Sequence, residues 1–469
     1  MTTRALLMLA LCSAPALTAS LPIYRQTLLH ARAHDTEAYN LPDGASLATS
    51  TPDIADRAAG VSMFWPRIVM RVSPIPNTNA QALWAGIAGA GALAFISEDI
   101  QGAYLSQATI NNTGIMVAEQ AVAGPPGVMR LYTGEGNILF LLNMPNLPYP
   151  FTSFGDPMIN TTAQIGYRAR TNAGGQAWLT WFGGVQFVHV AENTLDSSSP
   201  VSLLFPPAIN NSRQLAGKVR LGAPGQTGES QPDQIRVYNA DGFYIPIAQD
   251  RDFDPGSYYT AFDNAVAVNN AIQVAFIATR FSPPGVRSVI RADAFNPVEL
   301  VREGTNGILQ IEAVAPDINE RGFVVFRAIN ADGRRAIWLA DGASLAMVAR
   351  EGDQMPIDAG HTAILASLAP GGPVFSGPPR INNRADVVFA ASLVSTTEPP
   401  HSLGTGMFVA RASLRADTNG DDLVNALDLN LVLAQYGQTG PALSADLNGD
   451  HTVDFADLNL VLSDFSQGL

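Results

Sequence analysis

Short apolar runs separated by polar turns recur along most of this chain. Val324-Val325-Phe326 and Val387-Val388-Phe389 are apolar at consecutive positions, without the alternation of a strand that has one solvated face. A strand needs apolar residues on both faces when its sheet is packed between two neighbouring sheets. The pattern therefore predicts an all-β chain built from stacked sheets.

Many of these runs follow the same phrase, an Ile-Asn pair at the entry of a strand. The copies are INNTGIMVAE from Ile110, INTTAQIGYRA from Ile159, INNSRQLAGKV from Ile209, VNNAIQVAFIA from Val268, INERGFVVFRA from Ile318 and INNRADVVFAA from Ile381. A seventh, looser copy is PDIADRAAGVSMF from Pro52, which matches APDINERGFVVF with two residues inserted and has Ala55 in place of Asn. Asn can bond its own backbone and tolerates a left-handed turn, which suits a strand entry.

Each copy is followed by a second short strand and in most units by a third, as in LAFISED, LVREGT and LAMVAREGD. Repeats of about 50 residues with three or four strands are typical of propeller blades. We therefore predict a β-propeller over residues 25–412, with seven blades. Six or eight blades and a β-helix remain as alternatives.

The last unit lacks its third strand, and a matching piece lies at the other end of the chain. TLLHARAHDT, residues 27–36, has the pattern of LAMVAREGD. Pairing this N-terminal strand into the last blade would close the ring and remove exposed sheet edges.

The repeats resemble the tandem NxxGxxAF repeats of exported bacterial proteins. The Gly slot holds Gly114 and Gly322 in two copies, and other residues at Ala163, Arg213, Ile272 and Ala385. The resemblance covers nearly the whole central region and implies no settled activity.

Composition supports this picture and narrows the function. Charged residues make up 14% of the chain, while Gly (41) and Pro (32) are plentiful, which favours a turn-rich all-β protein. The net charge of −14 comes without a Lys/Arg cluster, so a nucleic-acid or anionic-membrane partner is not expected.

The first residues have the pattern of a signal peptide. Arg4 precedes an apolar stretch from Ala5 to Leu17, and small residues follow, so we predict a signal peptide over residues 1–19. The stretch is shorter than the roughly 20 residues of a membrane-spanning helix. The single cysteine, Cys12, lies in this segment, so the mature chain is expected to have no disulfide. These features predict a secreted or cell-surface bacterial protein without a transmembrane segment in the mature chain.

Near the end of the chain, ADTNGDDLVNALDLNLVLAQYG is followed by a second copy, ADLNGDHTVDFADLNLVLSDFS. Oxygen-bearing side chains occupy positions 1, 3, 5, 9 and 12 of two loops, and position 7 offers a backbone carbonyl. The predicted ligands are Asp417, Asn419, Asp421, Leu423, Asn425 and Asp428 in the first loop, and Asp446, Asn448, Asp450, Thr452, Asp454 and Asp457 in the second. This is the EF-hand spacing for calcium, a hard cation with six to eight oxygen ligands, so two calcium ions are predicted.

Position 6 of a standard EF-hand loop is Gly, but here it is Asp422 or His451. Both residue types are among those enriched at positive φ, so a left-handed turn is expected at each. Each loop leads into a short amphipathic helix, with apolar residues spaced i, i+3, i+4 and i+7. We expect one small shared core from Leu429, Val432, Leu433, Tyr436, Leu458, Val461, Leu462 and Phe465, too small to be stable without its ions.

Residues 413–469 resemble a type I dockerin, which has two DxNxDxxVxxxD loops, each followed by a helix. The resemblance implies calcium-dependent folding and docking to a cohesin-like partner or a cell-surface protein. In dockerins, positions 10 and 11 contribute to partner choice; here they are Ala426-Leu427 and Phe455-Ala456, unlike the hydroxyl pairs of cellulosomal dockerins.

The sequence shows no nucleophile elbow, phosphate loop or HExxH motif. His30 and His34 would share a strand face about 13 Å apart, too far for one ion. QDRDFDPG, residues 249–256, begins like a calcium loop but ends without a ligand at position 12.

Acidic residues recur where third strands end, namely Glu98-Asp99, Asp250, Glu303, Glu351 and Asp353. Two interpretations remain open for them: a ring around a cation or sugar pocket, or polar turns that leave the strands for solvent.

The sequence thus favours an exported, non-catalytic binding or scaffold protein, with a propeller that recognises a glycan or a protein and a calcium-dependent docking module. An extracellular glycosidase acting on polysaccharide is one alternative, because paired carboxylates are what glycoside hydrolysis requires. A cell-surface structural protein is the other.

Overall fold

The computed structural model describes most of the chain. The described residues are 21–33, 39–56, 66–73, 75, 78–87, 91–97, 104–121, 128–132, 138–142, 148–293, 296–358, 361–440, 443–448, 450–466 and 468. The predicted signal peptide, residues 1–19, lies outside them. The segment Pro22–Ser413 belongs to the larger of two compact units, and Leu423–Gly468, with both helices, to the smaller. No helix among the described residues is long and apolar enough to cross a membrane.

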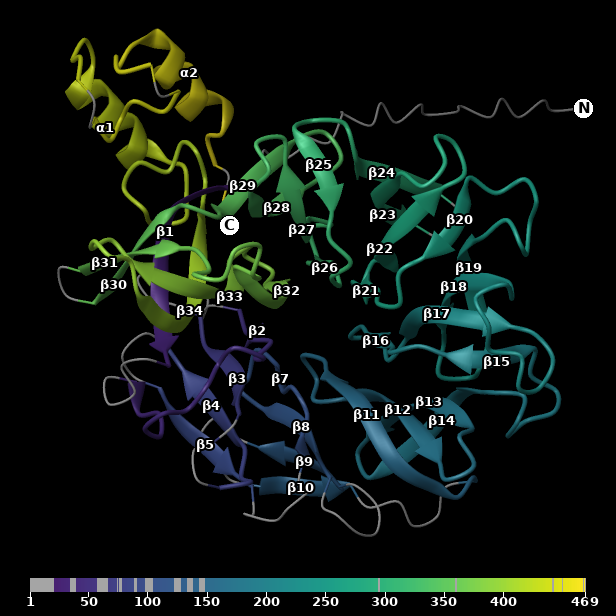
Figure 1. Ribbon diagram of the computed structural model, residues 1–469. Coiled ribbons are helices and arrows are strands. Elements are labelled where there is room, and N and C mark those ends of the chain that lie inside the picture. The colour runs from purple at the N-terminus through teal and green to yellow at the C-terminus, as the bar shows by residue number, and fades with distance from the viewer. Residues whose placement is uncertain are drawn as a thin grey trace, which may run out of the picture. The chain divides into compact units, whose positions relative to one another are not determined.

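The larger unit is a seven-bladed β-propeller, as the repeats predict. Its strands form seven antiparallel sheets, one for each repeat, and these follow one another around a common axis in the order of the chain (Figure 1).

The first three blades contain strands β2 to β14. Blade 1 consists of β2 (Asp53–Ile54), β3 (Ile68–Val72), β4 (Ala82–Gly86) and β5 (Ala92–Ile96). Blade 2 consists of β6 (Tyr104–Leu105), β7 (Thr109–Ile110), β8 (Met116–Ala121), β9 (Val128–Tyr132) and β10 (Ile138–Leu142). Blade 3 consists of β11 (Phe151–Ile159), β12 (Ile165–Thr171), β13 (Gln176–Phe182) and β14 (Val185–Ala191).

The next three blades contain strands β15 to β29. Blade 4 consists of β15 (Val201–Leu204), β16 (Ala208–Ile209), β17 (Leu215–Leu221), β18 (Asp233–Tyr238) and β19 (Tyr244–Gln249). Blade 5 consists of β20 (Tyr259–Phe262), β21 (Ala267–Val268), β22 (Gln273–Arg280), β23 (Arg287–Asp293) and β24 (Asn296–Arg302). Blade 6 consists of β25 (Ile308–Ile311), β26 (Asp317–Ile318), β27 (Val324–Asn330), β28 (Arg335–Ala340) and β29 (Leu345–Arg350).

Blade 7 joins the two ends of the propeller. It consists of β30 (Gln354–Asp358), β31 (His361–Leu365), β32 (Phe375–Ile381), β33 (Val387–Ser395), β34 (Ser402–Ser413) and the N-terminal β1 (Ile23–Arg32). The pairing of β1 with β34 is antiparallel, with Leu28 opposite Val409. The N-terminal strand therefore closes the last blade, in the place that the repeat pattern assigns to it.

The first blade differs from the predicted alignment. β2 pairs with β3, with Ile54 opposite Ile68, where blade 6 has Ile318 opposite Val324. The paired residues are 14 positions apart in blade 1 and 6 apart in blade 6, so the insertion is 8 residues long, not two. The predicted strand around Val61 lies outside the described residues.

The repeated Asn has two bonding roles. In blade 3, Asn160 Oδ1 accepts from the backbone N–H groups of Thr162 and Gln164, which fixes the turn into the strand. Its Nδ2 donates to the carbonyl of Asn210, the same position of the next blade, at 3.0 Å. Six such bonds run around the axis; their donors are Asn111, Asn160, Asn210, Asn269, Asn319 and Asn382, and the last acceptor is the carbonyl of Ala55. We call these seven positions the Asn ring.

The backbone conformation explains why the repeat pattern has Gly at one position. The residue three positions after the ring Asn has positive φ in each of the six Asn copies: Gly114 (81°), Ala163 (59°), Arg213 (59°), Ile272 (59°), Gly322 (78°) and Ala385 (65°). Gly takes this conformation without strain, and the other residues are held in it by the bonds to the Asn side chain.

Hydrophobic cores fill the spaces between neighbouring sheets. Val237 of blade 4 packs in one cluster with Phe276 and Ile290 of blade 5, and Val289 of blade 5 packs in another with Phe326 of blade 6. Phe276 and Phe326 are fully buried, which explains why these strands are apolar on both faces.

We expect Asn160→Ala to lower the free energy of unfolding by about 2–4 kcal/mol, because it leaves buried backbone groups of two blades without partners. Urea denaturation followed by tryptophan fluorescence measures the change. Thr161→Ala is the control, since no side-chain hydrogen bond is assigned to Thr161, and we expect a change within about 0.5 kcal/mol. Equal effects of the two substitutions would contradict the role of the ring.

Candidate metal site and axial channel

The first acidic loop brings three of its predicted ligands together. Carboxylate oxygens of Asp417, Asp421 and Asp428, at positions 1, 5 and 12, all lie within 4.8 Å of one another. Asp417 and Asp428 are buried. Three carboxylates this close repel one another unless a cation lies among them.

The twelfth position of each loop also orders the backbone. Asp428 accepts from the N–H groups of Thr418, Asn419 and Asn425. Asp457 accepts in the same way from Leu447, Asn448 and Asp454. Each aspartate thus binds both ends of its loop.

The ninth position of each loop caps a helix. Asn425 is the N-cap of α1 (Ala426–Gln435), and Asp454 is the N-cap of α2 (Phe455–Ser463). With Asp428 and Asp457 at the third helical positions, both helices begin with a capping box. These four predicted ligands therefore stabilise the helix starts as well.

The sixth position has the backbone that the EF-hand spacing predicts. Asp422 has a φ of 68° and His451 a φ of 67°. Both loops thus make the left-handed turn without Gly. The seventh position, Leu423 or Thr452, lies beside a short β-bridge, described below.

The second loop is closed by bonds among its own residues. Asp446 accepts from the N–H groups of Asp450 and His451, and the Asn448 amide donates to Asp450. In the part of this loop that the structure describes, its carboxylates do not gather into a group as tight as that of the first loop. Gly449 lies outside the described residues.

The two loop–helix motifs exchange backbone bonds with each other. Ser466, after α2, donates to the carbonyl of Val424 in the first loop, and Gly437, after α1, donates to that of Val453 in the second. Leu423 likewise forms a β-bridge with Gly468, and Thr452 one with Thr439. Each donor and each acceptor has its counterpart 29 positions away, so the two motifs are related by approximate twofold symmetry.

The shared core of the helices is smaller than the apolar spacing predicts. Val432 and Val461 are fully buried, and Leu429 and Leu458 are half-buried. Leu433 and Leu462 are each 52% exposed, and Tyr436 and Phe465 are exposed as well. Helices of 10 and 9 residues are too short to bury all four apolar positions of each against one partner.

In the propeller, acidic residues at the third-strand ends bind backbone N–H groups. Glu303 accepts from Arg287 of its own blade and Ile311 of the next, and Glu351 accepts from Arg335. Asp353 accepts from Arg350. Glu303 thus joins two blades, while Glu351 links two strands of its own blade and Asp353 fixes a turn. Glu98 and Asp99 lie outside the described residues.

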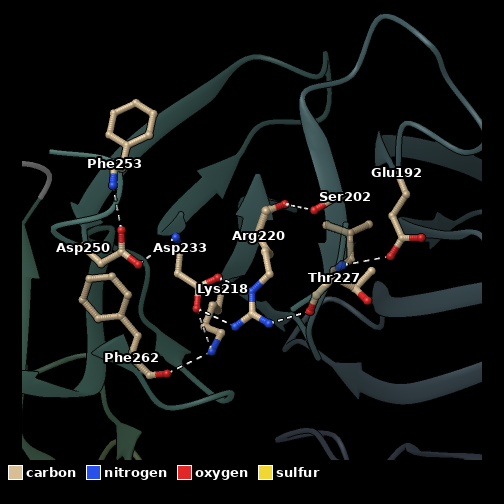
Figure 2. Close-up of polar contacts among 10 residues, drawn as sticks. Glu192, Ser202, Lys218, Arg220, Thr227, Asp233, Asp250, Phe253 and Phe262 are labelled. Carbon is tan, nitrogen blue, oxygen red and sulfur yellow. Dashed lines mark hydrogen bonds and ion pairs between the residues drawn. The ribbon is translucent and has the colours of Figure 1, made fainter. Parts of the chain in front are cut away.

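Two buried carboxylates of this kind, Asp250 and Glu192, lie on either side of a cluster of charged residues, Lys218, Arg220 and Asp233 (Figure 2). Asp250 accepts from Asp233 and Phe253 N–H groups, and Glu192 accepts from Leu204. Glu192 was not among the acidic residues predicted from the sequence, although it follows β14 as Asp250 follows β19. Burial raises the pKa of Glu192 to about 7 and also raises that of Asp250.

A cavity of about 540 Å³ lies beside this cluster, between blades 4 and 5. Lys218 and Arg220 both pair with Asp233, at 3.2 and 2.8 Å (Figure 2). Lys218 also donates to the carbonyl of Phe262 in the next blade, and burial lowers its pKa. The charged groups here are bound to one another, which makes the cluster a junction between blades.

A second cavity, of about 440 Å³, receives residues from every blade and thus lies on the propeller axis. We call it the axial cavity. One lining residue from each blade, in order, is Thr51, Gln107, Pro157, Pro206, Ala265, Ala315 and Arg380. Arg380 lies 3.7 Å from Asp317, and its charge also acts on Asp53 in blade 1.

Asp53, on β2, is a carboxyl group on which the charge of Arg380 acts. Burial raises the pKa of Asp53 to about 6, while Arg380 and the N–H of Ile110 oppose the shift. Burial also raises the pKa of Asp317.

The remaining predicted motifs have structural contacts. His30 is buried with its ring nitrogens 3.3 Å from the carbonyls of Leu28 and Pro66, and His34 lies outside the described residues. In the segment 249–256, Asp254 accepts from Gly256 and Gln249 and so fixes a turn.

Comparisons with known proteins concern the fold. No protein-family model matches this chain, and no curated protein matches it. Among solved structures, the subtype N11 neuraminidase-like protein of A/flat-faced bat/Peru/033/2010 (H18N11) is 10% identical over 83% of this chain and 94% of that chain, with a TM-score of 0.34. The β-propeller domain of the Trilobed protease from Pyrococcus furiosus is 10% identical over 76% and 95%, with a TM-score of 0.44. The putative TolB from Agrobacterium tumefaciens is 11% identical over 56% and 84%, with a TM-score of 0.36.

We expect Asp53→Asn to stabilise the propeller increasingly as pH rises. The folded pKa of Asp53 lies above its unfolded value, so its favourable contribution is present below about pH 4 and is lost as pH rises through about 6. Urea midpoints of wild type and variant at about pH 4.5 and 7.5 measure the difference. Asp293→Asn, an exposed carboxylate at the end of β23, is the control and keeps the wild-type pH profile. A gap that shrinks with rising pH would contradict the assignment.

Proposed function

We propose that this chain is an exported calcium-binding protein in which a propeller recognition domain is joined to a dockerin-like docking module. The proposal assigns one calcium ion to each acidic loop and no catalytic role to the propeller. The observation that carries it is the convergence of Asp417, Asp421 and Asp428.

The first loop fits calcium by distance and by chemistry. Oxygen ligands lie about 2.4 Å from calcium, so two ligands of one ion are at most about 4.8 Å apart. The three carboxylates satisfy this limit. They are hard oxygen donors, which calcium prefers to nitrogen or sulfur. Asn419, the Leu423 carbonyl and Asn425 would complete the ligand set.

The second loop supports the same assignment through its backbone. It repeats the turn at position 6 and the capping box, and Asp446, Asp450 and Asp457 stand at the positions of the first-loop cluster. Asn448, the Thr452 carbonyl and Asp454 would complete its set. A cation would replace part of the internal bonding of Asp446 and draw these oxygens together.

Calcium would then contribute to the stability of the smaller unit. Val424, Val432, Val453 and Val461 are its fully buried valines, a small core for two helices. Charge repulsion among the loop carboxylates opposes folding, and a bound cation removes that repulsion.

The exposed apolar residues of the helices supply the docking surface in this proposal. Leu433 and Tyr436 of the first motif, and their counterparts Leu462 and Phe465, remain accessible after the unit has folded. Leu433 and Leu462 lie on the helices, and Tyr436 and Phe465 just after them; exposed apolar side chains, where they form a patch, are typical of a protein-binding surface. The partner would be cohesin-like or a cell-surface protein.

Calorimetric titration of calcium into the chelator-treated full chain tests the metal sites. We expect two sites for wild type and one for Asp421→Asn and for Asp450→Asn, because each substitution removes a charged ligand from one loop. Asp196→Asn, a carboxylate outside the loops, keeps both sites. Unchanged binding in both loop variants would refute the calcium assignment.

Affinity capture tests the docking surface separately. The immobilised full chain with calcium is exposed to an extract of the source cells and then washed with chelator. We expect chelator to release a specific protein from wild type and from Leu309→Glu, an exposed propeller control, but not from Leu433→Glu/Leu462→Glu. Release of the same protein from the double variant would contradict docking through the helices.

A further inference from the structure

The axial cavity contains an arginine whose bonding is incomplete. Arg380 pairs with Val388 through the backbone of β32, but its side chain makes no hydrogen bond with any described residue, and its Nε is buried without a partner. Among the described residues, the side chain has one polar contact, the ion pair with Asp317 at 3.7 Å, which is longer than a hydrogen bond. The side chain is 18% exposed and lines the cavity.

Four other cationic side chains of the propeller have a hydrogen-bond acceptor in the neighbouring blade. They donate to a backbone carbonyl of the next blade: Arg71 to Leu105, Arg168 to Leu204, Lys218 to Phe262 and Arg327 to Gly377. Each joins two blades. The Arg380 side chain has no such acceptor in the part of the chain that the structure describes, although a guanidinium carries five N–H donors in a planar fork.

Donors left without acceptors in a partly buried site weaken the fold, and an incoming acceptor removes that penalty. A carboxylate matches the guanidinium fork with two parallel bonds. Glu119 lines the cavity, Asp317 pairs with Arg380, and Asp53 interacts with the charge of Arg380, so a doubly charged anion is disfavoured against a singly charged one.

The rest of the cavity suits the body of a small organic acid. Pro157, Pro206 and Val266 provide apolar surface, and Thr51 and Gln107 provide polar groups. Its volume, about 440 Å³, lies within the range of small-molecule sites.

We propose that the axial cavity is a binding site for a monocarboxylate, which Arg380 holds while its apolar or hydroxylated body lies against the proline-lined wall. This inference rests on the propeller's proposed role as a recognition domain and is independent of the calcium loops. The carboxylate could belong to a free organic acid or to a uronic acid of a polysaccharide.

Calorimetry with the calcium-loaded full chain tests the site. The probes are glucuronate, an oligouronide and benzoate, and their neutral matches are glucose, a neutral oligosaccharide of the same length and benzamide. We expect at least one carboxylate probe to bind, and its neutral match to bind at least tenfold more weakly. Preference for the oligouronide identifies a polysaccharide source, and preference for benzoate or glucuronate identifies a free acid. No binding of any carboxylate probe overturns the proposal.

Substitutions of Arg380 test whether this residue holds the carboxylate. We expect Arg380→Gln to weaken the best probe at least tenfold, and Arg380→Lys, which keeps the charge beside Asp317 but not the fork, to weaken it several-fold. Arg334→Gln, a surface control, leaves affinity unchanged. If Arg380→Gln does not fold, the lysine variant still provides the test, and wild-type affinity in it overturns the proposal. Calcium titration of the same proteins is unaffected, so failure here is distinct from failure of the metal sites.

Discussion

The propeller depends on a hydrogen bond from one asparagine amide to the backbone of the next blade. No covalent bond fixes the angle between one sheet and the next, and apolar packing alone is not directional. The Asn ring supplies that direction at the axis, where Asn269 Nδ2 lies 3.0 Å from the carbonyl of Asn319. The same side chain shapes its own turn through Oδ1, so strand entry and blade spacing are set by one residue.

This double role explains why the fold could be predicted from the sequence. The Ile-Asn phrase marks each innermost turn, and the apolar runs after it mark strands buried on both faces, so blade number and closure follow from the repeat. The alignment of blade 1 was wrong, because Ala55 replaces the Asn marker and the 8-residue insertion becomes visible only in the pairing of Ile54 with Ile68.

The sites were harder to predict, because residue type does not state what a side chain will bond to. Spacing alone identified the acidic loops and the turn at Asp422. It did not reveal that Glu303 binds backbone N–H groups of two blades, nor that Leu433 stays exposed. No sequence pattern marks Arg380, because its proposed role follows from the fold, in which no described hydrogen-bond acceptor lies within reach of its side chain. In the acidic loops, Asp428 and Asp457 order backbone and helix start whether or not a cation is bound, so metal ligation and capping share one geometry.

The closure of blade 7 has a consequence for how the protein is made. The ring is complete only when Ile23–Arg32 pairs with Ser402–Ser413, two segments separated by nearly the whole propeller. Contacts of such long range form slowly, because the intervening chain must first be brought together. The emerging polypeptide therefore cannot finish the ring until its last propeller strand has left the ribosome. Until then, Ile23–Arg32 has no strand to pair with, and the ring stays open.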